Sequence, residues 1–444
     1  MSVEHETLAP ISKIPNEVLS IIFEATQYLP PSSPGPERSS FEMILSHVTG
    51  CWRSVALNTP QLWTNIHITS QDSCQVQMAD AYLSRSGALP LTIHLVIDNF
   101  DLEVASAYHN LIAHLPRWSR LWLHCHWQVD LDKFLAPIEN STAPCLKLID
   151  IFLGSMPNPD MIDRRIFSGG APFLTYVRLR NLALRSCLPP LQSVTSLRLD
   201  EPNQALYTSP SQLASMLNEL PALTHLVLSG HYGEDGAPLA LIELPSLRSL
   251  HTLIFTDMFP TLLNMISAPH MESLLLEEIS AGHLDEFANL TFGSPKFPSL
   301  KSLTILPKPR QAFTLSTWEN VICVFPTVSC MTLSSHDPCD FLISLGPQTR
   351  PGSQDSVIPW PDLHTLTLIS ELELLPFAIG AFCNTISARF KAGYPIRKLQ
   401  LSNGVLAGLT DKLEWLQERA VVESTILFQN KPKNAYFTDL LDQV

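Results

Sequence analysis

The sequence predicts an α/β fold in which a short N-terminal helical module precedes a long array of parallel strands backed by helices. Two observations lead to this prediction. An eight-residue phrase, Pro-x-apolar-x-x-apolar-x-apolar, recurs at spacings mostly of 20 to 35 residues, which is the period of solenoid repeats. Helix-type apolar periodicity lies between several copies, and such alternation favours parallel strands on one face and helices on the other.

The composition narrows the class of protein. The chain has 444 residues, of which 45% are hydrophobic and 16% charged, and its net charge is −14. This is ample material for a core, and the negative charge argues against wholesale binding to nucleic-acid phosphates. Nine scattered cysteines without a CxxC pair suit reduced thiols. With no pattern of a secretory signal or a membrane span, we expect a cytoplasmic or nuclear protein without a membrane partner.

Three short apolar-periodic segments fill the stretch from residue 11 to residue 68. Pro15 precedes a first helical stripe, Phe41 begins a second stripe, and Trp52 begins a third that ends before Thr59-Pro60. Leu62 and Trp63 follow directly. A unit this small has little interior for so many large apolar groups, so we expect some of them to face a partner.

These segments resemble the F-box, the short helical module that binds the Skp-family adaptor of cullin-RING ubiquitin ligases. The matching stretches are Ile14-Pro15-Asn16-Glu17-Val18-Leu19 with Ile22-Phe23, then Val48, Trp52-Arg53 and Ala56-Leu57, then Leu62-Trp63. Thr59 to Trp63 also follows the ending common in F-box proteins of filamentous fungi. Two departures are Thr49-Gly50-Cys51, where the family has a Cys with basic neighbours, and a Pro-rich insert over 27–40.

The resemblance implies that this chain binds a Skp-family adaptor and, through it, a cullin. The residues that would contact the adaptor are Ile14, Pro15, Val18, Leu19, Ile22, Phe23, Val48, Trp52, Leu62 and Trp63.

The repeated phrase begins after a first alternating strand at 91–97. Proline fits the entrance of a strand because it lacks a donor, and the last two apolar positions face one side, toward the core. The copy at Pro245 is imperfect, because Leu253 falls one place late. The copies begin at Pro116, Pro144, Pro172, Val194, Pro221, Pro245, Pro269, Pro298, Pro326, Pro361 and Pro395. The chain therefore resembles the leucine-rich-repeat F-box proteins, although its copies are irregular and lack the Asn of regular repeats.

Helical patterns are expected from the Ser209-Pro210 cap, over 261–267, over 315–325 and, amphipathic, over 411–422. The polar segment 346–359 is expected to be an exposed loop. The domain organisation that follows is an F-box-like module over 8–68, a linker helix over 69–88, an irregular leucine-rich-repeat-like solenoid over 89–402, and a capping helix with a tail over 403–444.

Catalytic and metal-binding patterns are weak. No phosphate-binding loop, dinucleotide fingerprint, metalloprotease helix or nucleophile elbow is present. His124 and His126 are best explained as solvent-facing strand residues, and Cys323, Cys330, His336 and Cys339 lack the paired short spacing of zinc sites. We therefore assign no catalytic residue, metal or cofactor, and expect that the chain is not an enzyme.

A second binding surface is expected on the strand face that points away from the core. The residues between the last two apolar positions point there, as do those two places before and after them. The C-terminal copies place mainly Ser and Thr on this face, Thr252 and Thr304 among them. The N-terminal copies place Trp122, Tyr176, Arg178, Arg180 and Arg198 there, which are types enriched in binding hot spots. They suit an acidic or phosphorylated target segment; the alternative is solvated strand surface.

Together these patterns predict a substrate-recognition subunit of an SCF-type ubiquitin ligase. Its helical module would bind the adaptor, and its strand face would bind an unidentified target protein. The alternative is an adaptor-bound interaction scaffold without a role in ubiquitin transfer.

Overall fold

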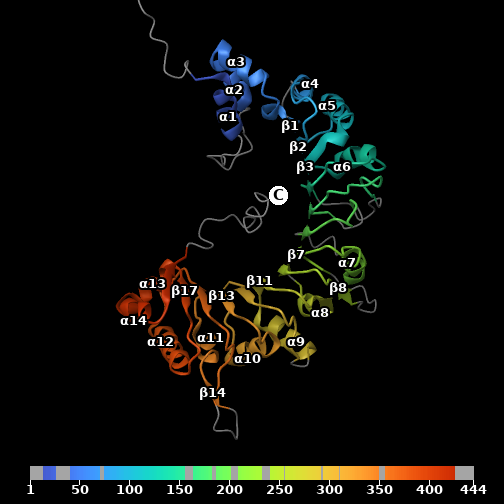
Figure 1. Cartoon of the computed structure of the whole chain (residues 1–444). Coiled ribbons are helices and arrows are strands. Elements are labelled where there is room, and N and C mark those ends of the chain that lie inside the picture. Colours follow the sequence, from blue (N-terminus) through green and yellow to red (C-terminus); the bar gives the residue numbers. More distant parts are fainter. Residues whose placement is uncertain are drawn as a thin grey trace, which may run out of the picture. The chain divides into compact units, whose positions relative to one another are not determined.

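The structure is a computed structural model (Figure 1) that describes residues 14–26, 41–70, 75–155, 164–182, 187–201, 209–232, 241–254, 256–291, 294–309, 311–349 and 356–425. The chain divides into two compact units, Met1–Ser193 and Val194–Val444. Each contains parallel strands alternating with helices, so the predicted α/β class is confirmed.

The first unit begins with helices and continues into a parallel sheet of order β1-β2-β3-β4-β5. Its elements are α1 (Asn16–Thr26), α2 (Phe41–Val48), α3 (Gly50–Leu57), the 3-10 turn η2 (Pro60–Trp63), β1 (Asn65–Thr69), α4 (Gln75–Arg85), β2 (Leu91–Ile97), α5 (Leu102–Ile112), η3 (Leu115–Arg117), β3 (Trp118–Cys125), α6 (Gln128–Leu135), η4 (Ala136–Ile138), β4 (Leu148–Leu153) and β5 (Tyr176–Arg180).

The second unit contains a parallel sheet of order β6-β7-β9-β11-β12-β13-β16-β17-β18, a parallel pair β8 and β10, and an antiparallel pair β14 and β15. Its elements are β6 (Ser196–Glu201), α7 (Pro210–Leu217), β7 (His225–Gly230), β8 (Ile242–Glu243), β9 (Ser249–Ile254), α8 (Phe259–Met265), β10 (Ile266–Ser267), β11 (Ser273–Ile279), α9 (Ala281–Leu290), β12 (Ser302–Pro307), α10 (Leu315–Val324), β13 (Cys330–Ser334), α11 (Cys339–Ser344), β14 (Gln348–Thr349), β15 (Ser356–Val357), β16 (Thr365–Ile369), α12 (Pro376–Lys391), β17 (Lys398–Leu401), α13 (Asn403–Gly408), η5 (Thr410–Lys412), α14 (Leu413–Gln417) and β18 (Val421–Ser424).

Every copy of the repeated phrase forms a strand, and its last two apolar positions usually lie in the core. Leu121 and Leu123 on β3, like Leu226 and Leu228 on β7, are buried. Consecutive helices pack against one another, and Figure 1 shows α8 to α11 together on one side of strands β9 to β13. We call the opposite strand face, which carries the alternate residues, the open face.

The copy at Pro245 differs from the prediction in one respect. The register pairs Thr252 with Leu228 and with Leu276, and Thr252 is buried at a position that other copies fill with leucine. The expected outward orientation of Thr252 is therefore wrong, and His251 occupies that place on the open face. The late Leu253 pairs with Ser229 on the same open face, because the alternation of a strand continues through an imperfect phrase.

The predicted helices differ in their ends. Ser209 caps α7 by accepting a hydrogen bond from the backbone N–H of Gln212 at 3.3 Å, as its sequence indicates. The pattern over 261–267 ends as a helix at Met265. The expected helix over 411–422 is wrong in extent, since α14 stops at Gln417 and β18 then pairs in parallel with β17.

Two further segments show the limits of local patterns. The ends of the expected loop over 346–359 form the pair β14 and β15, while residues 350–355 lie outside the described residues. Strand β1 was not predicted, although the alternation of Ile66 and Ile68 is its signal.

Candidate functional site

The N-terminal helices and η2 form a small module around their own core. Leu19, Phe23, Leu62 and Trp63 are all buried in it. The Trp63 indole N–H donates to the Ala56 carbonyl at 2.9 Å. These four predicted adaptor contacts therefore hold the module together, and the expectation that they face a partner is corrected.

The start of α3 shows how Thr49 and Gly50 fit the local structure. Thr49 is the N-cap, and its hydroxyl accepts a hydrogen bond from the backbone N–H of Trp52 at 3.1 Å. Gly50 is the first residue of the helix, so its poor helix propensity matters less there than in a helix interior. The Trp52 ring, which is half-buried, packs on Phe23 with 5.1 Å between ring centroids.

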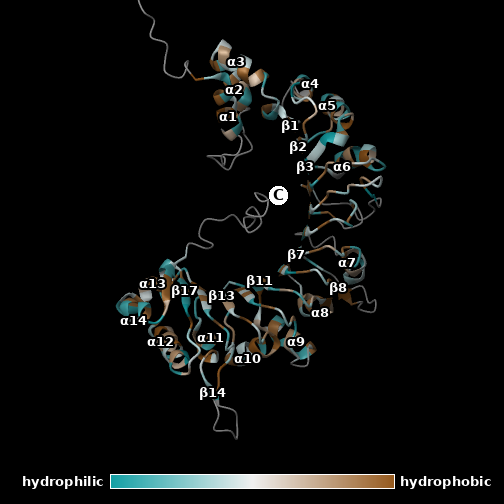
Figure 2. Cartoon of the chain, viewed as in Figure 1, coloured by the Kyte–Doolittle hydropathy of each residue, from teal (hydrophilic) through white to brown (hydrophobic). Residues whose placement is uncertain are grey.

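The remaining large apolar residues of α1 and α2 are exposed. Val18, Ile21 and Ile22 follow one stripe of α1, where Ile21 is 65% exposed. On α2, Ile44 and Val48 are each at least 50% exposed. Figure 2 shows apolar residues along helices α1 to α3. Two apolar stripes on a module whose core is complete are typical of a protein-binding surface. Of the other predicted contacts, Pro15 is exposed and Ile14 is half-buried.

Aromatic contacts attach the module to the first sheet. The Trp63 ring meets the Tyr82 ring of α4 edge-on, with 5.1 Å between centroids. The Arg85 guanidinium lies over the Trp63 ring at 4.3 Å, and the Tyr82 hydroxyl donates to the Glu42 carboxylate of α2. Helix α4, predicted as a linker, thus also packs directly on the module.

A ladder of rings crosses the open face of the first unit. His67, His94 and Trp122 occupy paired positions on β1, β2 and β3. The two histidine rings stack with 4.3 Å between centroids and 8° between planes, and His94 stacks on Trp122 at 4.3 Å and 3°. The predicted target residue Trp122 is half-exposed. Its stack with His94 holds the ring in one orientation.

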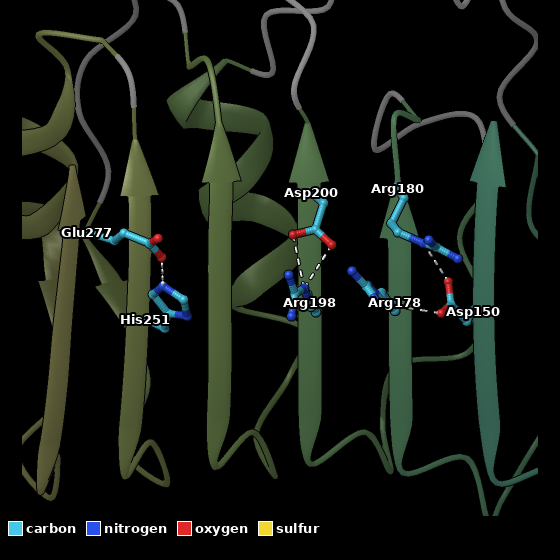
Figure 3. Close-up of polar contacts among 7 residues, drawn as sticks. All are labelled: Asp150, Arg178, Arg180, Arg198, Asp200, His251 and Glu277. Atoms are coloured by element: carbon cyan, nitrogen blue, oxygen red, sulfur yellow. Dashed lines mark hydrogen bonds and ion pairs between the residues drawn. The ribbon is translucent and has the colours of Figure 1, made fainter. Parts of the chain in front are cut away.

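Beside the ladder, one aspartate binds two arginines (Figure 3). Asp150 accepts a hydrogen bond from Arg180 Nε at 2.9 Å and lies 3.8 Å from Arg178 Nη1. The Arg180 guanidinium also lies 4.9 Å from the centroid of the Phe152 ring. Burial, with the nearby Arg180 charge, lowers the pKa of His124, which packs edge-on against Phe152 at 4.5 Å. The neutral imidazole therefore adds no positive charge at neutral pH.

The other two predicted target residues are less accessible. Tyr176 is only 4% exposed, although it alternates with the core residues of β5. Arg198 belongs to the second unit, where its Nε lies 2.8 Å from Asp200 Oδ2. Its side chain is 7% exposed, so the expectation that Tyr176 and Arg198 present contact surface is corrected.

The open face of the second unit is different in chemistry. Ser249, Ser273, Ser302, Thr304 and Thr332 stand at paired positions on neighbouring strands. One interaction among its strands is a contact of 3.0 Å between His251 Nε2 and Glu277 Oε2 (Figure 3). Both side chains of this pair are largely buried.

The described residues offer little to metal or thiol chemistry. Among them, no group of three or more His, Cys, Asp or Glu side chains is arranged to hold a metal ion. Burial raises the pKa of Cys125 and of Cys187 to about 12, so neither thiol forms a nucleophilic thiolate near neutral pH. No helix in this part of the chain combines the length and apolar character that a membrane span requires.

Comparison with known proteins adds no assignment, because no protein-family model matches the chain and no curated protein matches it significantly. The sequence prediction of binding residues does not include Asp150, His67 or His94, although the strand alternation places Asp150 on the open face. Each alternates with core residues on a strand. Register places His94 and Asp150 on either side of Trp122, and places His67 beside His94.

Proposed function

We propose that this chain is a substrate-recognition subunit of an SCF-type, cullin-RING ubiquitin ligase. The observation that carries the proposal is the pair of exposed apolar stripes on α1 and α2, on a module whose own core is already filled by Leu19, Phe23 and Trp63. The F-box-like order of residues from Ile14 to Trp63 supports a Skp-family adaptor as the partner of these stripes.

The strand array would hold the target. On this proposal the regions after the module are an irregular leucine-rich-repeat-like solenoid, and the target binds the open face of the first unit around Trp122 and Arg180. The chain forms no covalent intermediate. It raises the effective concentration of a target lysine near the transferase carried by the ligase, in the cytoplasm or nucleus where such ligases act.

The test uses exposed residues, because variants of Leu19 or Trp63 would also damage the core. Val18→Glu, Ile22→Glu and Val48→Glu place charges on the two stripes, and we expect each to weaken adaptor binding by about thirtyfold or more, a change of about 2 kcal/mol. Binding is measured with purified adaptor by calorimetry, and circular dichroism checks the fold.

Leu102→Glu is the matched control, since Leu102 is an exposed apolar residue of helix α5 in the same unit. If all three stripe variants bind the adaptor as the control does, the proposal is wrong. Reconstituted ubiquitin transfer to a co-purifying protein then separates a ligase subunit from an adaptor-bound scaffold, because the scaffold would bind the adaptor and transfer nothing.

A further inference from the structure

Two arginines on the open face of the first unit retain donors that the described residues do not use. Arg120 alternates with the core residues of β3 and, in the described part of the chain, forms no side-chain hydrogen bond or ion pair. Arg180 uses Nε for Asp150, while its terminal Nη1 and Nη2 donate to none of the described residues. Although the chain carries a net charge of −14, guanidinium donors of this kind attract an anionic ligand locally.

Trp122 lies between these two arginines. It is two residues from Arg120 on the same strand, and its ring is held by the stack with His94. An anchor held in one orientation loses little conformational entropy when a ligand packs on it. An apolar group on the ligand, flanked by negative charges, would therefore match this surface.

The arrangement favours a carboxylate over a phosphate. Phosphate sites are typically clusters of arginines, whereas Arg178 is only 12% exposed and is already engaged with Asp150. The accessible edge of Arg180 is a single planar fork, which matches the two oxygens of one carboxylate. The Asp150 carboxylate, 2.9 Å from Arg180 Nε, would also repel a dianion more strongly than a monoanion.

We infer that the open face of the first unit binds an unmodified acidic peptide segment that has an apolar residue between two acidic ones. This inference rests on the proposed function only in taking the segment to be part of the target. Arg120 and Arg180 bind the carboxylates, Trp122 packs on the apolar side chain, and Asp150 is a positioning residue that orients Arg180.

Sheet geometry gives the spacing of the segment. Residues along a strand are about 3.3 Å apart and neighbouring strands about 4.8 Å apart. Arg120 therefore lies about 7 Å from Trp122, and Arg180, two strands across and two residues further along, lies about 12 Å from it. An extended peptide matches these distances with one acidic residue two positions from the apolar residue and the other three or four positions away on the opposite side.

The experiment probes the full chain with arrays of synthetic peptides. Each peptide has one Leu, Phe or Trp and two Asp residues placed at varied distances on either side; matched sets replace Asp with Asn or with phosphoserine. We expect the tightest binding at the spacing given above, with at least tenfold loss in the Asn set. Arg120→Gln and Arg180→Gln should each weaken binding about tenfold, and Trp122→Ala about thirtyfold.

Arg248→Gln is the matched control, because Arg248 is an exposed arginine paired with Glu272 in the second unit, and it should leave peptide binding unchanged. Trp122→Phe keeps an aromatic anchor if Trp122→Ala unfolds. The inference is overturned if no Asp peptide binds, if phosphoserine peptides bind more than tenfold tighter than Asp peptides, or if both Arg→Gln variants bind as the control does. Adaptor binding is measured on the same variants. Its failure contradicts the proposed function alone, and loss of peptide specificity contradicts this inference alone.

Discussion

The open faces of the two units share one backbone arrangement but differ in the side chains that they present. Both are rows of alternate residues on parallel strands in register. The first unit places Trp122, Arg120 and Arg180 on these rows, with donors directed to solvent or to one shared aspartate. The second unit places mainly Ser and Thr there. Its His251 and Glu277 side chains are largely buried, and Lys398 and Glu423, on its last two strands, form a partly exposed ion pair of 2.9 Å.

The difference separates two uses of polar side chains. The first unit presents large, partly exposed Trp and Arg side chains, types that contribute much of the binding energy where a partner contacts and pairs them. In the second unit, buried pairs satisfy each other, so their removal should affect folding more than binding. The alternation of the strand sets which face a residue points to. The residues on neighbouring strands determine whether its side chain remains accessible to a partner.

The largest effect is expected from a charge in the core of the second unit. Leu226→Asp introduces an unpaired carboxylate at a fully buried position of β7, which should cost more than about 3 kcal/mol. We expect limited proteolysis to cut in the neighbouring copies around β6 and β9 as well, because repeats stabilise one another through their neighbours. Leu226→Val is the conservative control. Cleavage confined to the loops beside β7 would contradict a cooperative array.

A buried arginine in the second unit offers the next test. Arg389 is fully buried, and its guanidinium donates to the carbonyls of Leu345, Pro359 and Trp360 at 2.7 to 3.2 Å. Burial lowers its pKa to about 10. These carbonyls lie on either side of the segment that contains β14 and β15, so Arg389 fastens the base of that pair.

Arg389→Met should leave the carbonyls unsatisfied and lower the free energy of unfolding by about 1–3 kcal/mol. Hydrogen exchange should increase first at Gln348 and Val357, which pair in β14 and β15. Peptide and adaptor binding by the first unit should not change. If they weaken as much as stability does, polar groups of the second unit also serve binding, and the contrast between the two faces fails.

The pair of His251 and Glu277 gives a smaller effect of the same kind. His251→Ala leaves a largely buried carboxylate without its partner at 3.0 Å, and should reduce stability by about 1–2 kcal/mol without affecting peptide binding. Arg120→Gln should show the reverse, with weaker binding and nearly unchanged stability, since the Arg120 side chain forms no hydrogen bond or ion pair in the described part of the chain. Chemical denaturation and peptide titration on both variants measure the two quantities. Equal effects in both assays would contradict the distinction.

The sequence predicts the features of this structure that depend on neighbouring residues in the chain, and fails where contacts between strands decide. Strand phase is local, since alternation of Leu226 and Leu228 is enough to place both in the core. Whether a side chain on the open face is exposed cannot be predicted from its own strand, because residues of the neighbouring strands can cover or bind it. Tyr176 has the right phase and is nonetheless buried, and Arg198 is bound by Asp200. The F-box-like stretch likewise showed which residues are apolar, but not that Leu19 lies in the core.

The smallest effect is expected from a buried histidine on a helix of the second unit. His283, near the start of α9, has a side chain that is only 7% exposed, and Nε2 lies 3.5 Å from Asp257 Oδ1. Burial is the main cause that lowers its pKa, and the charge of Lys308 lowers it further. The hydrogen bond that His283 donates to Asp257, with the charges of Asp257 and Glu286, opposes the shift. The folded state therefore binds the proton less readily than the unfolded state does.

Stability from this histidine is complete above its unfolded pKa of about 6.5 and falls as the pH drops below it. Because one histidine binds at most one proton, its contribution to the free energy of unfolding can fall by no more than about 1.4 kcal/mol per pH unit. His283→Gln should remove that part of the decline between about pH 7 and 5, measured by denaturant titrations at several pH values. His109→Gln, at an exposed histidine of α5, should leave the decline intact. Identical pH profiles for the two variants would show that burial of His283 does not control acid sensitivity, and that exposed and buried histidines of the two units behave alike.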